Sequence, residues 1–421
     1  MKLLPTVFLS GISTAIGMMC SLVTGKMLAI FVGAAGFAFI GQFINFIQLV
    51  QVVAGNVYQQ GIIKYSAEYR DDPVFLSGLY QNASALMLSA IFLLFLLIQY
   101  FANSLSIFIF HTSSYVIVIR VFAFMLVLFI FNNFFLSILN GLREIKKYVF
   151  AQIVGSVFST LLGVILIFYF KLWGALLSLT LYQGGVFFVT AWLLFKTGKF
   201  KFNYLRPVFY QEKLKKLLAF ASMSVVAGVA GPLSQLLVLN YLVHHLGPID
   251  TGYWQAMNRL GTAGTAIITT ALSVYYIPTL SALKDKKEIL KEITHCYKVF
   301  MPILAILCLV LWCCRDYIII ILFTKQFEPM RELFMIQLIG VMFQIASWII
   351  CNLMWAKAMY RIFIISEVIF VGMFVLLTVL FTNWLGFQGS VLGFCVNYIG
   401  YFIFSILLLF FYLKQSCESR H

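Results

Sequence analysis

Four ionisable residues stand inside long apolar segments of this 421-residue chain: Lys26, Arg120, Arg259 and Glu367. In a membrane-spanning helix, each such residue costs roughly 2.5–3.5 kcal/mol at the centre on insertion scales. A residue kept at that cost normally faces a water-filled cavity or a partner. Three cations against one acid therefore predict a site that holds an anion, such as a phosphate group.

The depth of these residues follows from helix geometry. At 1.5 Å per residue, Lys26 lies about 10 Å before the turn that begins at Gly33. Arg120 and Arg259 lie about as far from the same outer boundary, and Glu367 lies about 10 Å from the inner one. Each has a structural alternative. The cations could snorkel to the outer interface, and Glu367 could pair with a cation near its own boundary, such as Arg361.

Two expected helices carry a polar face on an otherwise apolar surface, each within an arc of about 120°. One face consists of Gln255, Asn258, Arg259, Thr262, Thr265, Thr269 and Ser273, and the other of Gln42, Asn45, Gln48, Asn56, Gln59 and Gln60. Such faces must meet water or another polar helix. We expect them to line a central cavity, with Asn45, Gln48, Gln255, Asn258 and Thr262 contacting substrate hydroxyl groups. The alternative is hydrogen-bonded packing between helices.

Composition identifies the elements that position these residues. Hydrophobic residues make up 62% of the chain and charged residues only 10%, against about 25% charged in soluble domains. The chain is therefore expected to be an all-α polytopic membrane protein, because helices satisfy the backbone in lipid. Twelve apolar segments can be marked, at roughly 6–32, 37–62, 78–101, 113–140, 148–170, 173–197, 215–245, 251–279, 296–318, 330–356, 360–384 and 387–413.

Basic residues set the orientation. With the N-terminus in the cytoplasm, 22 of the 29 basic residues fall in inside segments and only four in outside segments. This bias predicts that both termini are cytoplasmic. The net charge of +15 is thus explained by orientation, and no nucleic-acid partner is expected.

The longest polar stretch divides the chain into two halves. Residues about 214 positions apart are similar in type and occur in the same order in both halves. Arg143 falls on Lys357, and the Gly33 turn falls on Gly247. The predicted organisation is an N-terminal six-helix lobe (1–200), a cytoplasmic linker (201–214), a C-terminal six-helix lobe (215–413) and a cytoplasmic tail (414–421). Repeats of this kind, related by an axis along the membrane normal, are common in transporters.

Motifs of catalysis are missing from the sequence. It contains no Walker A, H-E-x-x-H, G-x-S-x-G or G-x-G-x-x-G pattern, and its eight cysteines show no metal-ligand spacing. We therefore expect a transporter that is not an enzyme and that needs no cofactor or metal.

Short motifs spread over almost the whole chain carry a family resemblance. They include Gly25-Lys26-Met27-Leu28-Ala29, Lys64-Tyr65, Ala67-Glu68-Tyr69, Trp254-Gln255, Ser273-Val274-Tyr275, Pro278-Thr279-Leu280-Ser281, Arg315-Asp316, Met330-Arg331-Glu332-Leu333-Phe334, Gln337, Ala356-Lys357-Ala358, Arg361 and Glu367-Val368. In their order and spacing the sequence resembles Wzx-type lipid-linked oligosaccharide flippases. Within these it is most similar to flippases for enterobacterial common antigen lipid III and O-antigen units. This family shares a superfamily with the multidrug and toxic-compound extrusion (MATE) transporters.

The resemblance implies a MATE-like fold of two six-helix lobes around a cavity that opens alternately to each side. It implies transfer of an undecaprenyl-diphosphate-linked glycan from the cytoplasmic to the periplasmic leaflet of a bacterial inner membrane, for polysaccharide biosynthesis. Lys26 would be a cavity cation and Glu367 a polar anchor. Membrane lipids, a polysaccharide polymerase and a chain-length regulator are the implied partners.

The site residues point to one mechanism. We expect Lys26, Arg259 and Arg120 to hold the diphosphate, while the membrane potential or a proton on Glu367 drives transport. The rivals are a drug extruder of the same fold, a membrane glycosyltransferase or polymerase, and a lipid-binding scaffold. An extruder of cations would need an acidic cavity, and a polymerase would need a substantial outside loop.

Overall fold

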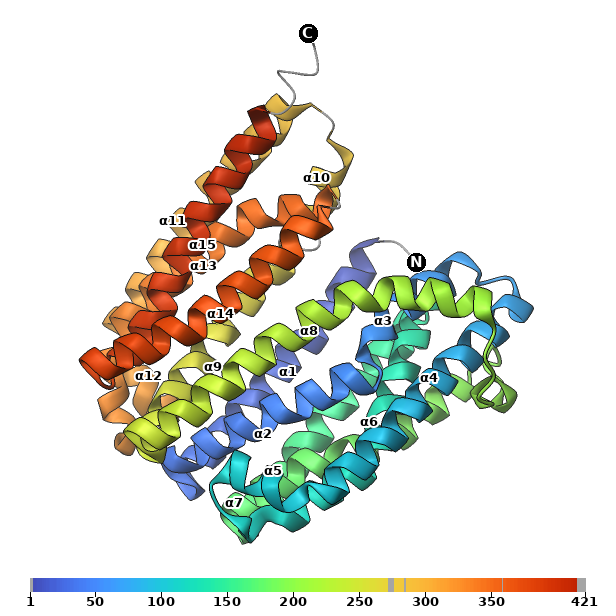
Figure 1. The fold of residues 1–421 in the computed structure, drawn as a ribbon, viewed down its shortest axis with the longest axis horizontal. Coiled ribbons are helices and arrows are strands. Elements are labelled where there is room, and N and C mark those ends of the chain that lie inside the picture. Colours follow the sequence, from blue (N-terminus) through green and yellow to red (C-terminus); the bar gives the residue numbers. More distant parts are fainter. Residues whose placement is uncertain (1–2, 272–275, 284, 358, 415–421) are drawn as a thin grey trace. The chain divides into compact units, whose positions relative to one another are not determined.

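The computed structural model describes residues 3–271, 276–283, 285–357 and 359–414, and in these ranges it contains helices and no strand. The first helices are α1 (Leu3–Phe31), α2 (Gly33–Ala54), η1 (Asn56–Tyr58), α3 (Gln59–Glu68), α4 (Pro73–Tyr100), α5 (Ala102–Phe110), η2 (Ser113–Tyr115), α6 (Val116–Gly141), α7 (Ile145–Phe195), η3 (Phe202–Leu205) and α8 (Gln211–Leu246). They are followed by α9 (Pro248–Ala271), α10 (Ile277–Ala282), α11 (Lys286–Cys313), α12 (Arg315–Leu322), η5 (Lys325–Leu333), α13 (Phe334–Ala356), α14 (Tyr360–Leu385) and α15 (Gly389–Lys414) (Figure 1). Most of the predicted tail lies outside the described residues.

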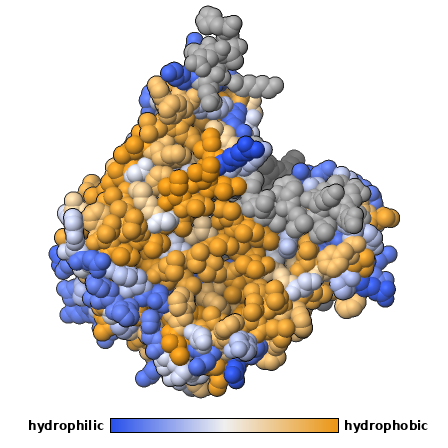
Figure 2. Space-filling model, viewed as in Figure 1, coloured by the Kyte–Doolittle hydropathy of each residue, from blue (hydrophilic) through white to orange (hydrophobic). Residues whose placement is uncertain are grey.

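The expected all-α polytopic class is confirmed. Within the described residues, nine helices are long and apolar enough to cross a membrane. One of them, α7, is 51 residues long and is interrupted by non-helical Lys171, so it comprises two spans. Helices α8 and α9 coincide with two further predicted segments, although they are not among the nine. The total of twelve spans stays a prediction. Figure 2 shows apolar residues covering the visible flanks of the helices, with hydrophilic residues gathered toward their ends.

The chain divides into two compact units, residues 1–236 and 237–421. Both units contain a share of α8, because the division falls inside this helix, four residues after Pro232. In the second unit, α13 packs against α15, and α14 packs against α15. In the first, α7 packs against α1 and α6. The lobe boundaries proposed from the sequence stay predictions.

Backbone geometry reveals the internal repeat. Lys171 (φ 50°, ψ −124°) and Gly386 (φ 59°, ψ −130°) are 215 residues apart and share a conformation that favours glycine. Glu144 (φ −81°, ψ 53°) and Met359 (φ −82°, ψ 52°) have the same spacing. The equivalent register at this second turn is thus 215, one residue longer than the predicted pairing of Arg143 with Lys357.

Hydrogen bonds repeat at the same positions. The Glu144 amide donates to the Leu139 carbonyl at 2.9 Å, and the Met359 amide donates to the Met354 carbonyl at 2.8 Å. Both pairs span five residues, and each is followed by a helix. The two units therefore share local turn structure at matched positions, although few side chains match.

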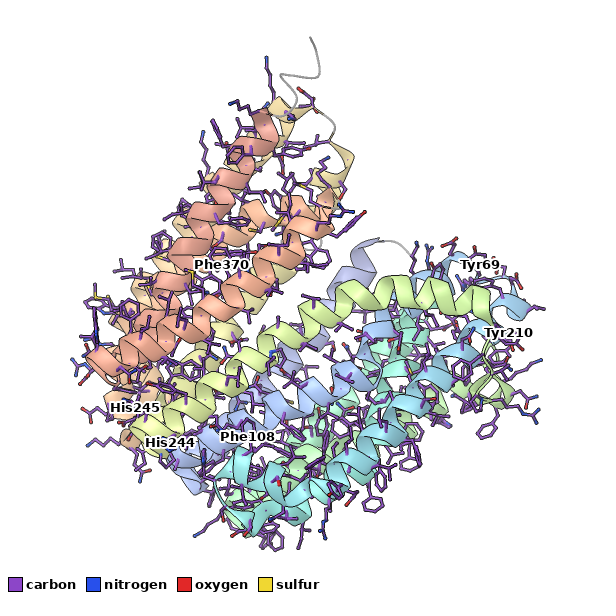
Figure 3. All side chains as sticks on the ribbon, viewed as in Figure 1. Tyr69, Phe108, Tyr210, His244, His245 and Phe370 are labelled. Atoms are coloured by element: carbon purple, nitrogen blue, oxygen red, sulfur yellow. The ribbon has the colours of Figure 1, made fainter. Side chains whose placement is uncertain are left out.

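The polar segment after α7 lies against the first unit. Asn82 of α4 forms two hydrogen bonds with the backbone of Tyr210: its Nδ2 donates to the carbonyl (3.0 Å) and its Oδ1 accepts from the amide (2.8 Å). The buried rings of Phe200 and Tyr204 pack on Tyr80, with centroids 5.8 and 6.0 Å away. Figure 3 shows Tyr210 and Tyr69 at the same end of this unit. We call residues 196–210 the linker strap.

An ion pair holds the start of the linker strap. Lys199 Nζ lies 2.8 Å from a Glu144 carboxylate oxygen, and Lys147 Nζ lies 3.6 Å from the other. The hydrogen bond from Lys199 lowers the pKa of the Glu144 carboxyl, against a smaller opposing effect of partial burial. The strap is therefore tied to α4 by Asn82 and to the start of α7 by Glu144.

Candidate functional site

Lys26 lies in α1, half-buried, five residues before the helix ends at Phe31. Its neighbours Gly25, Leu28 and Ala29 are buried, whereas Val23 and Ile30, which share its side of the helix, are exposed. Lys26 therefore lies at the edge of the packed side of α1, about 10 Å from the Gly33 turn. Its predicted role as a cation that holds phosphate stays a prediction.

Arg120 lies on the outside of the first unit. It is exposed and shares an arc of about 80° on α6 with three exposed apolar residues, Ile117, Phe124 and Val127. The residues between them, Val118, Ile119, Phe122 and Ala123, are buried. A surface of this composition is typical of a helix side that faces lipid, which favours the snorkelling interpretation of Arg120. Its predicted role as a cation that holds phosphate stays a prediction.

The polar face expected on one continuous helix over 37–62 is interrupted. Helix α2 ends at Ala54, and the chain passes through Gly55 and η1 before α3 begins at Gln59. The break lies where the chain approaches α6 closely, because a Cβ on Gly55 would stand 2.8 Å from Ile130 Cγ2. Asn56, Gln59 and Gln60 are thus separated from the rest of the face by a change of backbone direction.

The part of this face on α2 is mixed in character. Gln48 is exposed, as expected for a residue that contacts substrate. Asn45 is buried and its Nδ2 donates to the Gly41 carbonyl at 2.9 Å, which uses one of its donors within the helix. Gln42 is fully buried, and neither of its amide atoms has a hydrogen-bond partner within the described part of the chain.

In the second unit, α9 presents the other polar face. Asn258 and Arg259 are half-buried and Thr262 is exposed. The Thr262 hydroxyl donates to the Asn258 carbonyl at 2.9 Å, a common arrangement for threonine in membrane helices. Gln255 is half-buried, and its Oε1 is buried without a partner among the described residues. Ser273 of the predicted face lies outside the described residues.

Buried Gln337 of α13 adds an amide to this region, which the sequence interpretation did not assign to the site. A Cβ on Gly261 of α9 would stand only 3.1 Å from Gln337 Nε2. Glycine thus lets this amide approach the α9 backbone. The contact could not have been identified from the sequence, because the two residues are 76 positions apart.

Glu367 belongs to a polar cluster inside the second unit. It is half-buried on α14 and lies within electrostatic range of Tyr398, Tyr401 and Cys351. The Tyr398 hydroxyl accepts a hydrogen bond from Gln344 Nε2 at 2.8 Å. The Tyr401 ring packs on Phe370, which is labelled on α14 in Figure 3, with centroids 4.7 Å apart.

The alternative pairing of Glu367 with Arg361 does not form in the described structure. Arg361 is exposed at the start of α14. Six residues of helix place the two side chains about 120° apart around the helix axis. The repeat places Gln152 at the position of Glu367, 215 residues earlier, where Gln152 Nε2 donates to the Tyr148 hydroxyl at 2.8 Å. A neutral amide thus occupies the equivalent position in the first unit.

A cluster of four amides, which the sequence interpretation did not recognise as a group, surrounds the break after α2. It consists of Gln51, Asn56, Gln59 and Asn133, all half-buried. Asn56 Oδ1 accepts from Gln59 Nε2 (3.0 Å) and from Asn133 Nδ2 (3.2 Å), and Asn56 Nδ2 lies 3.4 Å from Gln51 Oε1. In the sequence, only the two consecutive asparagines 132 and 133 within apolar α6 indicated a polar group at this place. In the described ranges, no group of three or more His, Cys, Asp or Glu residues forms a metal site.

Comparisons with known proteins agree with this architecture. A family model described as polysaccharide biosynthesis protein matches residues 3–284. The Lipid III flippases of Escherichia coli K12 and Shigella flexneri are each 30% identical over 394 residues, covering 93% of this chain and 94% of theirs.

Solved structures share the fold at low identity. An inward-facing multidrug resistance MATE family transporter of the MOP superfamily has a TM-score of 0.76 at 15% identity, covering 93% of this chain and 94% of its own. A MOP superfamily transporter from Pyrococcus furiosus has a TM-score of 0.67 at 15% identity, covering 96% and 95%. The chain therefore belongs to the polysaccharide biosynthesis protein family and has the MATE-like fold of the MOP transporters.

Proposed function

We propose that this protein is a flippase that moves an undecaprenyl-diphosphate-linked oligosaccharide from the cytoplasmic to the periplasmic leaflet of a bacterial inner membrane. The observation that carries the proposal is the similarity to Lipid III flippases, which extends over nearly the full length of both chains. Lipid III or an O-antigen unit is the proposed cargo. Membrane lipids, a polysaccharide polymerase and a chain-length regulator are the proposed partners.

The proposed binding of the diphosphate rests on Lys26 and Arg259. Both are half-buried cations in helices at comparable depth, one in each unit. A charge-assisted hydrogen bond to phosphate is about twice as strong as a neutral one. Arg120 is left out of this proposal, because it is exposed among exposed apolar residues, an arrangement that favours snorkelling.

The glycan is proposed to contact Gln48 and Asn45 on α2, and Gln255, Asn258 and Thr262 on α9. Exposed Gln48 and Thr262 and the unpartnered Gln255 oxygen support this assignment. Amide and hydroxyl groups suit sugar hydroxyls, because both donate and accept hydrogen bonds. The lipid tail stays in the bilayer throughout.

The membrane potential is the proposed driving force. An anion that moves outward across an inside-negative membrane gains about 2.3 kcal/mol per charge per 100 mV. Two phosphate charges crossing the full field therefore gain roughly 4–5 kcal/mol per 100 mV. Proton transfer on Glu367 is the alternative drive, supported by its position among Tyr398, Tyr401 and Cys351.

Transport in proteoliposomes tests the proposal. Purified protein is reconstituted with lipid III, a membrane potential is imposed, and accessibility of the glycan to an enzyme outside is followed over time. Protein-dependent exposure of the glycan is expected. The second candidate, a multidrug extruder, is favoured by the MATE structural neighbours. Export of a cationic dye without movement of lipid III would replace the flippase proposal with it.

A further inference from the structure

The amide cluster at the break after α2 has the composition of a carbohydrate subsite. It gathers Gln51 from α2 before the break, Asn56 from η1 within it, Gln59 from α3 after it, and Asn133 from α6. Its three hydrogen bonds leave the carbonyl oxygens of Gln59 and Asn133 and the side-chain nitrogen of Gln51 without partners within the described part of the chain. Two acceptors and one donor group are therefore available to a ligand.

The surroundings of the cluster are partly open. All four amides are half-buried, and Gln48 and Gln60 on either side of it are exposed. A side-chain amide that faces hydrocarbon loses its hydrogen bonds, at a cost of several kcal/mol. This cost favours an aqueous space on this side of α2 and α3.

The depth of the cluster separates it from Lys26. Asn56 comes 23 residues after the Gly33 turn, or about 35 Å along the helix, which exceeds the hydrocarbon thickness of about 30 Å. Lys26 lies within about 10 Å of the same turn. In the proposed orientation, the cluster lies at the cytoplasmic boundary, where the glycan of an inner-leaflet lipid resides before transport.

The second unit does not repeat this group. At the 215-residue shift, Asn133 corresponds to Trp348, and at the 214-residue shift, Gln51 corresponds to Thr265. Equivalent turns elsewhere in the two units do share backbone geometry. The amides are therefore a property of the first unit and not a requirement of the repeated fold.

We propose that Gln51, Asn56, Gln59 and Asn133 form a cytoplasmic loading subsite that binds hydroxyl groups of the glycan before the diphosphate reaches Lys26. This inference rests on the proposed flippase function. It adds four residues to the proposed binding site and an earlier step to the proposed transport. In this step the amides select the glycan at the cytoplasmic side, while the cations bind the diphosphate that all such lipids share.

The test compares two lipids on variants in nanodiscs: lipid III, and undecaprenyl diphosphate, which carries no sugar. Asn133→Leu removes one free acceptor and one cluster bond while keeping the number and branching of side-chain heavy atoms. We expect its affinity for lipid III to fall about tenfold while its affinity for undecaprenyl diphosphate stays at the wild-type value. Asn132→Leu is the matched control, because Asn132 lies next in sequence but is buried and bonds to Gln183 at 3.0 Å. It should leave the ratio of the two affinities unchanged.

Other outcomes overturn the inference. If Asn133→Leu lowers the affinity for both lipids equally, or changes neither affinity, the cluster is only structural. Gln59→Leu provides the same test from the other side of the break if Asn133→Leu does not fold. A wild-type chain with equal affinity for both lipids would refute the subsite while lipid III transport still supports the flippase. A wild-type chain that neither binds nor moves lipid III would refute both.

Discussion

Replacing Asn82 by leucine tests whether the linker strap is fastened to α4. The side chain is fully buried and makes two hydrogen bonds with the Tyr210 backbone, at 3.0 and 2.8 Å. Each is worth about 0.5–1.5 kcal/mol net, and leucine has the same number and branching of side-chain heavy atoms, so no cavity term is added. Because the Tyr210 side chain is exposed, water can replace part of the loss at its backbone. We therefore expect the free energy needed to open the linker strap to fall by about 1–2 kcal/mol.

Hydrogen–deuterium exchange of residues 200–210 in nanodiscs measures this opening. The Tyr210 amide, which donates to Asn82 Oδ1, should exchange about five- to thirtyfold faster in Asn82→Leu than in the wild type. Asn82→Asp keeps the acceptor and should protect the amide more than leucine does. Gln81→Leu is the control, since it removes a single longer bond to the Asn203 carbonyl (3.2 Å). Wild-type exchange in Asn82→Leu would refute the reasoning.

Two further predictions concern the turns. Lys199 lowers the folded-state pKa of Glu144, so the ion pair stabilises the fold above the ordinary pKa of 4.5, and this contribution is lost as pH falls through the lowered value. Glu144→Gln should thus be less stable than the wild type by about 0.5 kcal/mol at pH 7. In thermal unfolding measured over a series of pH values, the two proteins should become equally stable at pH values below the lowered pKa of Glu144. A constant difference at all pH values would contradict this account. Lys171→Gly should raise the unfolding temperature, because it relieves a strained conformation that costs about 1–3 kcal/mol. Gly386→Ala should lower the unfolding temperature, because it introduces the same strain. Calorimetry that shows the opposite changes in unfolding temperature would exclude strain at these turns.

Much of the fold could be predicted from the sequence. Long apolar segments with few charges predicted the helices, because a chain of this composition must satisfy its backbone within helices in lipid. The spacing of Gly33 and Gly247 predicted a turn that recurs in both halves, and both glycines do have positive φ (76° and 89°). The turn at Lys171 could not be matched in this way, because lysine stands where the second unit has glycine.

The site was less predictable, because the direction of a side chain depends on tertiary packing. Arg120 and Lys26 looked equivalent in depth, and they differ in burial, because Arg120 is exposed and Lys26 is half-buried. The helical arc that joined Gln48 to Gln59 assumed an unbroken helix, which the approach of Gly55 to α6 interrupts. Asn133 reaches Asn56 from a distance of 77 residues in sequence, so no local pattern could reveal their contact.

The central claim is that a half-buried cation in α1 holds the diphosphate during transport, and a comparison of Lys26→Gln with Arg120→Gln tests it most directly. Each variant removes one positive charge from a helix of the first unit at similar depth, but Lys26 is half-buried and Arg120 is exposed. Initial rates of lipid III translocation are measured in proteoliposomes under an imposed potential, at equal amounts of folded protein. We expect Lys26→Gln to lose at least about tenfold in rate, the loss of a hydrogen bond to a charged group, while Arg120→Gln transports at the wild-type rate. Full activity of Lys26→Gln, or equal losses in both variants, would contradict the account.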